Sequence, residues 1–109
     1  MSDDAPLGTF EEQVMVAVLR TGEYAYGMAV RREIEAVIGR DVTIGAVYAT
    51  LDRLEAKKLV ASRRTAGETA RRVFTVTPRG ARALAASRAM RERLWQGVDL
   101  AALLPRGAG

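Results

Sequence analysis

Arginine is the side chain best suited to binding chemistry in this sequence, and it is concentrated in the second half of the chain. Residues 59–109 contain ten arginines and three acidic residues, a net charge of +7. Residues 1–58 contain seven Lys or Arg and ten acidic residues, a net charge of −3. A planar guanidinium can donate two hydrogen bonds to one phosphate or carboxylate. The distribution favours an anionic partner, with a solvated helix surface as the alternative.

Four of these arginines flank one short turn. The turn covers residues 66–70 and contains a single acidic residue, Glu68. Like charges on both sides of a turn repel each other unless an anion lies between them. This cluster therefore predicts contacts with DNA phosphates, with a solvated hairpin as the alternative. The four residues are Arg63, Arg64, Arg71 and Arg72. Arg31 and Arg32 are weaker candidates, because Glu35 follows Arg31 by four residues.

The sequence also excludes several kinds of chemistry. Its 109 residues include no histidine and no cysteine, which removes thiol nucleophiles, Ser-His-Asp triads, Cys/His zinc sites and disulfides. We expect no enzyme activity, no metal and no cofactor. The sequence has no apolar run near the ~20 residues of a membrane span and no signal-peptide pattern. We therefore expect a cytoplasmic protein without membrane contact.

Helical periodicity predicts two helices in the acidic half of the chain. A capping box, with Thr9 as the cap and Glu12 reaching back, predicts the start of a helix over residues 9–20. A second helix is predicted over residues 27–38, and Gly39 is suited to end it.

A third helix is predicted over residues 43–58, with Thr43 as its cap at an end where phosphate oxygens also bind. Its apolar face consists of Ile44, Val47, Leu51 and Leu54. The opposite face begins with small residues, which allow close approach to a groove, and continues with basic residues that either contact phosphate or pair with acids. It consists of Gly45, Ala46, Ala49, Arg53 and Lys57. Tyr48 lies at the edge, where it either packs in the core or reaches a phosphate.

The remaining residues predict a hairpin and a last helix. Residues 59–65 and 71–77 are typical of two short strands. Thr77 as cap and Pro78 as first helical residue predict a helix that runs to about Gln96. A final turn over residues 100–104 is expected to pack back onto the body.

Three helices, a basic hairpin and a fourth helix predict a winged helix-turn-helix, whose third helix enters the major groove beside a hairpin wing. The predicted fold class is mainly α with a small β-hairpin: a winged helix-turn-helix plus a C-terminal dimerisation helix. Four regions are predicted: a flexible tail (1–8), a DNA-binding domain (9–77), a dimerisation helix (78–104) and a disordered tail (105–109).

Three segments, residues 26–35, 43–55 and 72–80, carry a resemblance to a known family. The most specific part is the Gly-x-x-Tyr-x-x-Leu-x-x-Leu pattern of the third helix, followed by an Arg-rich hairpin and Thr-x-x-Gly. With these segments the sequence resembles the PadR family of bacterial transcriptional regulators, over about residues 7–85. Met28 stands where an aromatic often follows the glycine of the second helix, and no glycine precedes Leu59.

The resemblance is to the short PadR branch, and it implies a homodimeric repressor whose C-terminal helix pairs with the partner chain. In some short PadR regulators an aromatic on this helix stacks a planar ligand between subunits. Trp95, with Met90 and Leu94, is therefore interpreted as a dimer-interface anchor, with contact to a small-molecule effector as the alternative.

We predict a sequence-specific DNA-binding transcriptional regulator. It is expected to be a homodimeric repressor that binds a two-fold symmetric operator in double-stranded DNA through helix 43–58 and the wing 59–77. A winged-helix protein-interaction module, or a regulator of another winged-helix family, remains an alternative.

Overall fold

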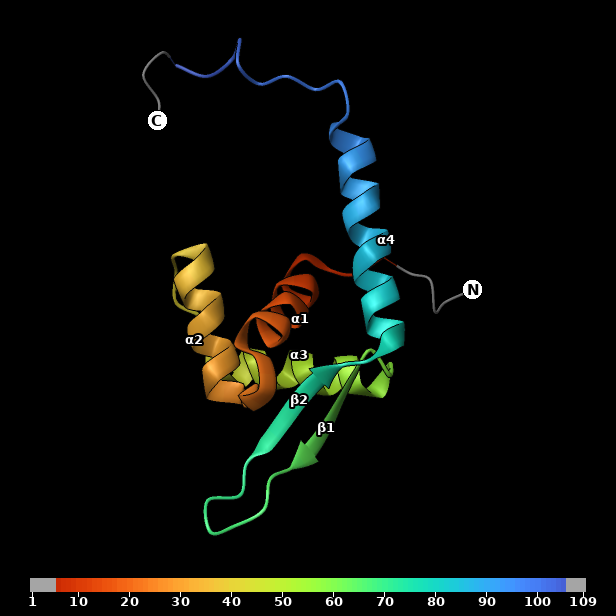
Figure 1. The fold of residues 1–109 in the computed structure, drawn as a ribbon. Coiled ribbons are helices and arrows are strands. Elements are labelled where there is room, and N and C mark those ends of the chain that lie inside the picture. The colour runs from red at the N-terminus through yellow and green to blue at the C-terminus, as the bar shows by residue number, and fades with distance from the viewer. Residues whose placement is uncertain (1–5, 106–109) are drawn as a thin grey trace.

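The computed structural model describes residues 6–105, so residues 1–5 and 106–109 of the two predicted tails lie outside the described residues. Figure 1 shows a helical body with a hairpin below it and a last helix that rises away from it. The elements are α1 Thr9–Thr21, a short 3-10 helix Gly22–Tyr24, α2 Gly27–Ile38, α3 Ile44–Ala56, β1 Val60–Arg64, β2 Arg72–Val76 and α4 Pro78–Trp95. The predicted fold class, mainly α with a small β-hairpin, is confirmed.

The start of α1 differs from the predicted capping box. Gly8 is the N-cap, and its backbone N–H donates to Glu11 Oε1 at 2.9 Å. Thr9 is already helical, so the prediction of Thr9 as the cap is wrong by one residue. Glu12 does not reach back to the cap, because its carboxylate pairs with Arg91 of α4.

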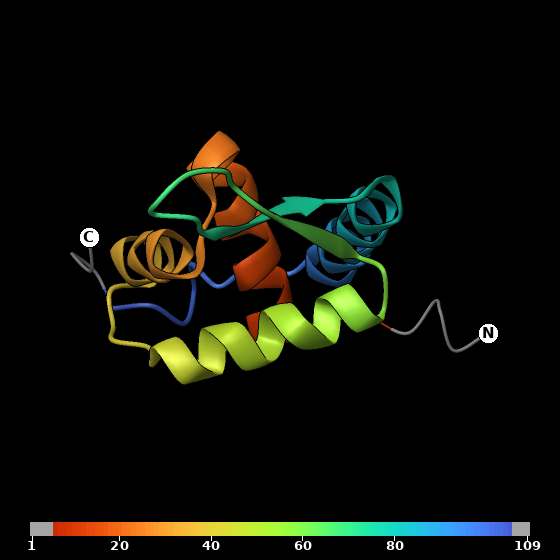
Figure 2. The same cartoon turned by 90° about the horizontal axis from the view of Figure 1, so that it is seen from below.

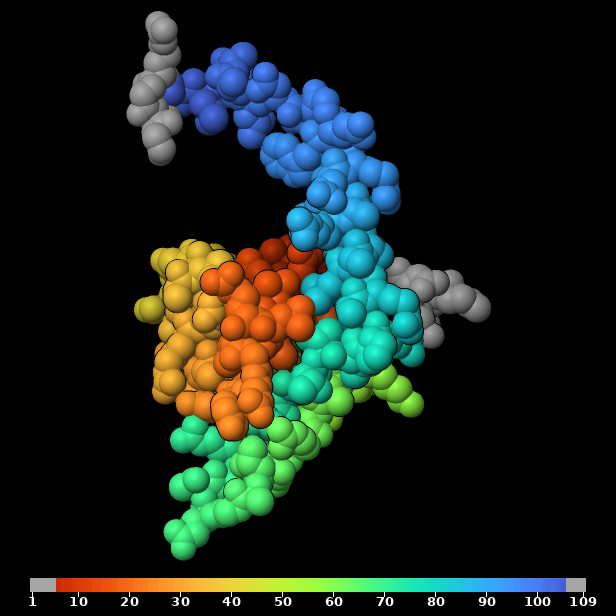
Figure 3. All heavy atoms as spheres, in the orientation of Figure 1, coloured from red at the N-terminus to blue at the C-terminus, as the bar shows by residue number. Residues whose placement is uncertain are grey.

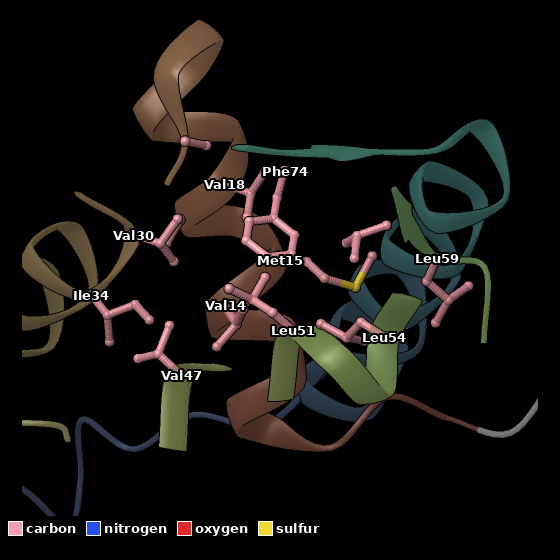
Figure 4. Packing of buried hydrophobic residues seen from close by; sticks show 13 residues of the cluster. Val14, Met15, Val18, Val30, Ile34, Val47, Leu51, Leu54, Leu59 and Phe74 are labelled. Carbon is pink, nitrogen blue, oxygen red and sulfur yellow. The ribbon is translucent and has the colours of Figure 1, made fainter. Parts of the chain in front are cut away.

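The core lies where α1, α2 and α3 meet the inner face of the hairpin. Figure 4 shows Met15 and Val14 of α1 between the buried faces of α2 and α3, with Phe74 of β2 above them. The predicted apolar face of α3 is confirmed, since Val47, Leu51 and Leu54 are fully buried and Ile44 packs against the cluster. Burial of these side chains is the main stabilising contribution to the body.

The hairpin is tied to both neighbouring helices. β1 and β2 pair antiparallel, with Val60 opposite Val76 and Arg64 opposite Arg72. The N–H of Phe74 donates to the carbonyl of Ala25 at 2.9 Å, so the segment before α2 lies beside β2. The wing therefore has a defined direction relative to α2 and α3.

The C-terminal end of α3 closes in a Schellman motif. The N–H of Leu59 donates to the carbonyl of Leu54 at 2.9 Å, and the N–H of Lys58 donates to that of Glu55 at 2.9 Å. Lys58 has a φ of 64°, the left-handed conformation that glycine adopts most easily. The lysine thus occupies a backbone position at which a glycine is favoured.

Lys58→Gly is expected to stabilise the protein by about 0.5–1 kcal/mol, because relief of the left-handed strain exceeds the greater entropy of an unfolded glycine. Urea unfolding of the variant and the unchanged protein measures this difference. Ala56→Gly, in the helical last turn of α3, is the control and should lose about 1 kcal/mol. Equal losses in the two variants would contradict the argument.

Helix α4 begins as predicted and then leaves the body. Thr77 accepts a hydrogen bond from the N–H of Gly80 at 3.0 Å, and Pro78 is the first helical residue, which confirms the predicted cap. The first half of α4 packs against the core through Ala83 and Leu84. The radius of gyration is 16.4 Å, whereas about 13 Å is usual for a compact chain of ~100 residues. The second half of α4 and the segment after it account for this elongation.

The C-terminal segment differs from the sequence prediction. A turn forms, with the N–H groups of Leu103 and Leu104 donating to the carbonyl of Leu100. Leu103 is 81% exposed, however, and Figure 1 shows the segment running above the body instead of against it. The expectation that residues 100–104 pack back is therefore wrong. Within the described residues, no helix combines the length and apolarity that a bilayer crossing needs.

Candidate nucleic-acid interface

The N-terminal half of α3 exposes small residues. Thr43 caps the helix as predicted, accepting the N–H of Ala46 at 3.1 Å. Gly45, Ala46 and Ala49 are all exposed. Figure 2, seen from below, shows α3 running along one edge of the body. A groove could therefore approach the helix backbone closely at this end.

Tyr48 connects α3 to the start of α2. Its ring lies directly over Gly27, where an added Cβ would be 2.3 Å from Tyr48 Cζ. The side chain is half-buried, so its ring packs in the body. A side chain at position 27 would displace the Tyr48 ring from this position.

The two cations at the basic end of α3 differ in their contacts. Lys57 Nζ lies 3.0 Å from Glu11 Oε2, so the acid-pairing alternative holds for Lys57, with a partner on α1. Arg53 donates to the hydroxyl of Thr50 at 3.2 Å and forms no ion pair with any described residue. Its charge helps to hold the pKa of Glu11 below the ordinary value, but no carboxylate lies within ion-pair distance of the guanidinium among the described residues.

Arg72 braces the wing against α3. Its guanidinium lies 2.9 Å from Asp52 Oδ1, pairs with Glu55 and stacks 4.7 Å from the Phe74 ring centroid. Glu55 also accepts the N–H of Ser62 at 3.1 Å, which adds β1 to the network. Arg72 is thus neutralised by two carboxylates in the free protein. The sequence prediction did not distinguish it from the other three wing arginines.

The stability that Glu55 contributes through its contacts with Ser62 and Arg72 depends on pH. Hydrogen bonds from Ser62, and then the Arg72 guanidinium, hold the pKa of Glu55 below its ordinary value. A lowered folded-state pKa contributes stability above the unfolded pKa, and this contribution is lost as pH falls through the folded pKa.

Glu55→Gln is expected to lower the unfolding free energy by about 1 kcal/mol at pH 7, because a charged hydrogen-bond acceptor at a partly exposed site is lost. Urea unfolding at pH 7 and at pH 3 measures the difference, which should shrink at the lower pH. If the two proteins differ in unfolding free energy by the same amount at both pH values, the ionised Glu55 carboxylate is not the source of this stability.

The other wing arginines occupy two faces of the hairpin. Arg64 lies opposite Arg72 in the strand pairing, and residues opposite each other share a face. Arg63 lies opposite Val73 and is therefore on the other face. The four predicted arginines do not form one patch.

A basic hollow lies between the start of α2, the middle of α3 and the wing. Its volume is about 590 Å³, and no acidic residue lines it. The lining includes Tyr26, Arg32, Tyr48, Arg64, Arg71 and Arg72. Arg71 lies 4.2 Å from the Tyr26 ring centroid, a cation–π distance.

Tyr26 is a lining residue that the sequence prediction missed, and Arg32 is one that it ranked as a weaker candidate together with Arg31. Arg31 pairs with Glu35 at 3.4 Å, as the spacing predicted, but Arg32 faces the wing instead. The available signal was the i, i+4 spacing of Met28 and Arg32, which places both on the helix face that lines the hollow.

Three residues predicted for a dimer or effector contact lie at the far end of α4. Met90, Leu94 and Trp95 are 41%, 72% and 52% exposed. Figure 3 shows this end of α4 projecting from the body. The described residues of one chain leave this apolar surface uncovered.

The sequence matches the model of the family described as "Transcriptional regulator PadR-like family" over residues 15–86. The chain belongs to this family. A solved PadR family transcriptional regulator from Eggerthella lenta is 30% identical, with a TM-score of 0.65 and coverage of 78% of this chain and 76% of that one. The chain is accordingly a PadR-like DNA-binding transcriptional regulator.

Other solved structures similar to this PadR-like chain are of RosR. The complex structure of hsRosR-S4 is 26% identical, with a TM-score of 0.71, and covers 90% of this chain and 81% of that one. The structure of H. salinarum RosR grown from NaBr is 25% identical, with a TM-score of 0.68, and the match covers 85% of this chain and 80% of that one. No curated protein gives a significant match.

Proposed function

We propose that the protein is a homodimeric repressor that binds a two-fold symmetric operator through α3 and the wing. The observation that carries this proposal is the exposed small-residue end of α3 beside arginines that have no carboxylate partner. Arg53, Arg63, Arg64 and Arg71 form no ion pair within residues 6–105. Such groups can replace the counterions of DNA phosphates and supply affinity, while α3 reads the bases.

Base reading by this α3 would depend on shape more than on hydrogen bonds. The exposed side chains at its start belong to Thr43, Ala46 and Ala49, which offer methyl groups and one hydroxyl, and Gly45 offers only its backbone. Methyl contacts recognise thymine, and sequence-dependent groove shape supplies further discrimination. Operators rich in A·T steps are therefore the expected class of site.

Dimerisation through α4 is supported by its unpartnered apolar side chains. Leu94 and Trp95 are more than half exposed, and the helix end that carries them stands clear of the body. Large apolar side chains that gather in exposed positions at one helix end are typical of a protein–protein interface. A second copy related by two-fold symmetry would cover both helices and place two α3 helices about 34 Å apart.

Leu94→Arg is expected to convert the dimer into a monomer, because two buried guanidiniums would meet at the interface without partners. Light scattering after size exclusion measures the mass, and far-UV circular dichroism checks that the fold is kept. Ala85→Arg, at an exposed position nearer the body, is the control and should stay dimeric. A Leu94→Arg protein that remains dimeric would rule out this interface.

The remaining predictions concern location and ligands. We place the protein in the cytoplasm as a DNA-binding regulator without enzyme activity. A small-molecule effector that contacts Trp95 stays a prediction, and such an effector would act by changing the spacing of the two α3 helices.

Selection of bound sites from random duplex DNA tests the proposed function. The expected result is a two-fold symmetric consensus whose half-sites lie about 10 base pairs apart, one turn of the duplex. Asymmetric single sites would contradict the dimeric arrangement, and recovery of no preferred sequence would contradict sequence-specific regulation.

A further inference from the structure

The basic hollow between α2 and the wing contains more unpaired charge than any requirement of folding explains. Arg72, at one side of it, is neutralised by Asp52 and Glu55. Arg32, Arg64 and Arg71 also line the hollow and form no ion pair with any described residue. Three guanidiniums that line one space without a carboxylate repel one another, and a bound anion would relieve this repulsion.

Tyr26 holds this arrangement in place. Its backbone forms a bridge with Val73 of β2, and it is the N-cap of α2. Its ring supports the Arg71 guanidinium at 4.2 Å from the centroid. Arg32 lines the same hollow as Tyr26 and Arg71. The interaction with Arg32, and then that with Arg71, lowers the pKa of the Tyr26 phenol. One tyrosine therefore brings together a cation from α2 and a cation from the wing.

The position of the hollow indicates which anion it takes. Tyr48 of α3 forms part of its wall, so the hollow adjoins the α3 surface proposed to enter the groove. When a helix lies in the major groove, the sugar–phosphate backbone passes beside it. The start of α2 also contributes the positive end of the helix dipole on this side.

We propose that the hollow is a clamp for one backbone phosphate of duplex DNA, held by Arg32, Arg71 and the hydroxyl of Tyr26. This inference rests on the proposed function and adds two residues to the binding surface. The clamp would lock α2 and the wing to the same DNA strand. It would fix the register of α3 without reading a base, as phosphate contacts do.

The test measures the affinity of the full-length protein and its variants for a duplex carrying the selected operator over a series of salt concentrations. Arg32→Ala is expected to reduce the slope of log affinity against log salt by about 0.9 for each bound protomer. Affinity should fall about tenfold at moderate salt, to a similar extent for operator and random sequences. Arg82→Ala removes the same charge from an exposed position on α4 and should leave both values unchanged.

A second arm locates the contact on the DNA. Neutral methylphosphonate linkages are placed singly along the operator, and each duplex is tested with the unchanged protein and with Arg32→Ala. At one position in each half-site, the neutral linkage is expected to weaken binding by the unchanged protein and to leave binding by Arg32→Ala unaffected. Tyr26→Phe, which keeps the ring under Arg71, should weaken binding of the unmodified duplex by about threefold, since one hydrogen bond is lost.

The outcomes separate the clamp from the proposed function. If the unchanged protein binds no duplex, the proposed function fails and the clamp fails with it. If it binds, but Arg32→Ala behaves like Arg82→Ala and no linkage is specific to Arg32, only the clamp is overturned. Competition by inorganic phosphate at matched ionic strength, reversed by Arg32→Ala, would instead assign the hollow to free phosphate and also overturn the clamp.

Discussion

Ala46→Glu is expected to weaken duplex DNA binding at least 100-fold while the protein remains folded. The side chain is exposed on the α3 face that we propose enters the groove. A carboxylate within about 4–6 Å of a phosphate is repelled by about 3 kcal/mol near a protein surface, a factor of ~100 in affinity. Two protomers on one operator would increase the loss.

The same substitution should not destabilise the free protein. Position 46 is the third residue of α3, and its N–H already donates to the Thr43 hydroxyl at 3.1 Å. A carboxylate at this position completes a capping box with Thr43 and lies near the positive end of the helix dipole. The unfolding free energy is therefore expected to rise by about 0.5 kcal/mol.

Electrophoretic mobility shift and urea unfolding measure the two quantities on one preparation. Ala86→Glu, at an exposed position on α4, is the matched control for the added charge. It should bind DNA with at most a small loss. If Ala46→Glu and Ala86→Glu bind alike, α3 does not enter the groove by this face.

Gly80→Ala is expected to destabilise the protein by about 3 kcal/mol or more, a loss typical of overpacking against rigid atoms. An added Cβ would lie 2.0 Å from the carbonyl oxygen of Leu59 and 3.0 Å from Met15 Cε. The Leu59 oxygen belongs to the backbone and accepts hydrogen bonds from the N–H and hydroxyl of Thr77, both at 3.1 Å. The clash would therefore displace the joint between α4 and the body.

Gly45→Ala is the control for this prediction. Position 45 is also helical, but nothing lies within 4 Å of an added Cβ. Alanine has the higher helix propensity, so Gly45→Ala should gain about 0.5–1 kcal/mol. Urea unfolding compares both variants with the unchanged protein. Similar changes at the two positions would show that the close approach of Gly80 to Leu59 is not a constraint.

The elements of the fold were predictable because their signals are local. The cap at Thr43, the proline after Thr77 and the apolar period of α3 each lie within one element, and the structure confirms them. The error at the start of α1 lies where a tertiary contact competes with a local one, whereas the error at residues 100–104 concerns a tertiary contact that does not form. In α1, Glu12 pairs with Arg91, which is 79 residues away in the sequence.

The sequence predicted where the candidate arginines lie better than it predicted which of them are paired with acidic residues. Arg71 and Arg72 are adjacent, yet Arg72 lies against Asp52 and Glu55 while Arg71 lies over a tyrosine ring. Both line the same hollow, but their acidic or aromatic neighbours come from α3 and from the start of α2. Sequence spacing alone cannot show which arginine is neutralised.

The affinity of the unchanged protein for duplex DNA between 50 and 200 mM salt tests the central claim most directly. The described surface offers several unpaired arginines on each protomer, so log affinity should fall linearly with log salt, by about 10³-fold or more across this range. Ala46→Glu should show little binding at any of these concentrations. The absence of duplex binding at 50 mM salt, or an affinity that does not change with salt, would contradict the assignment of α3 and the wing to DNA.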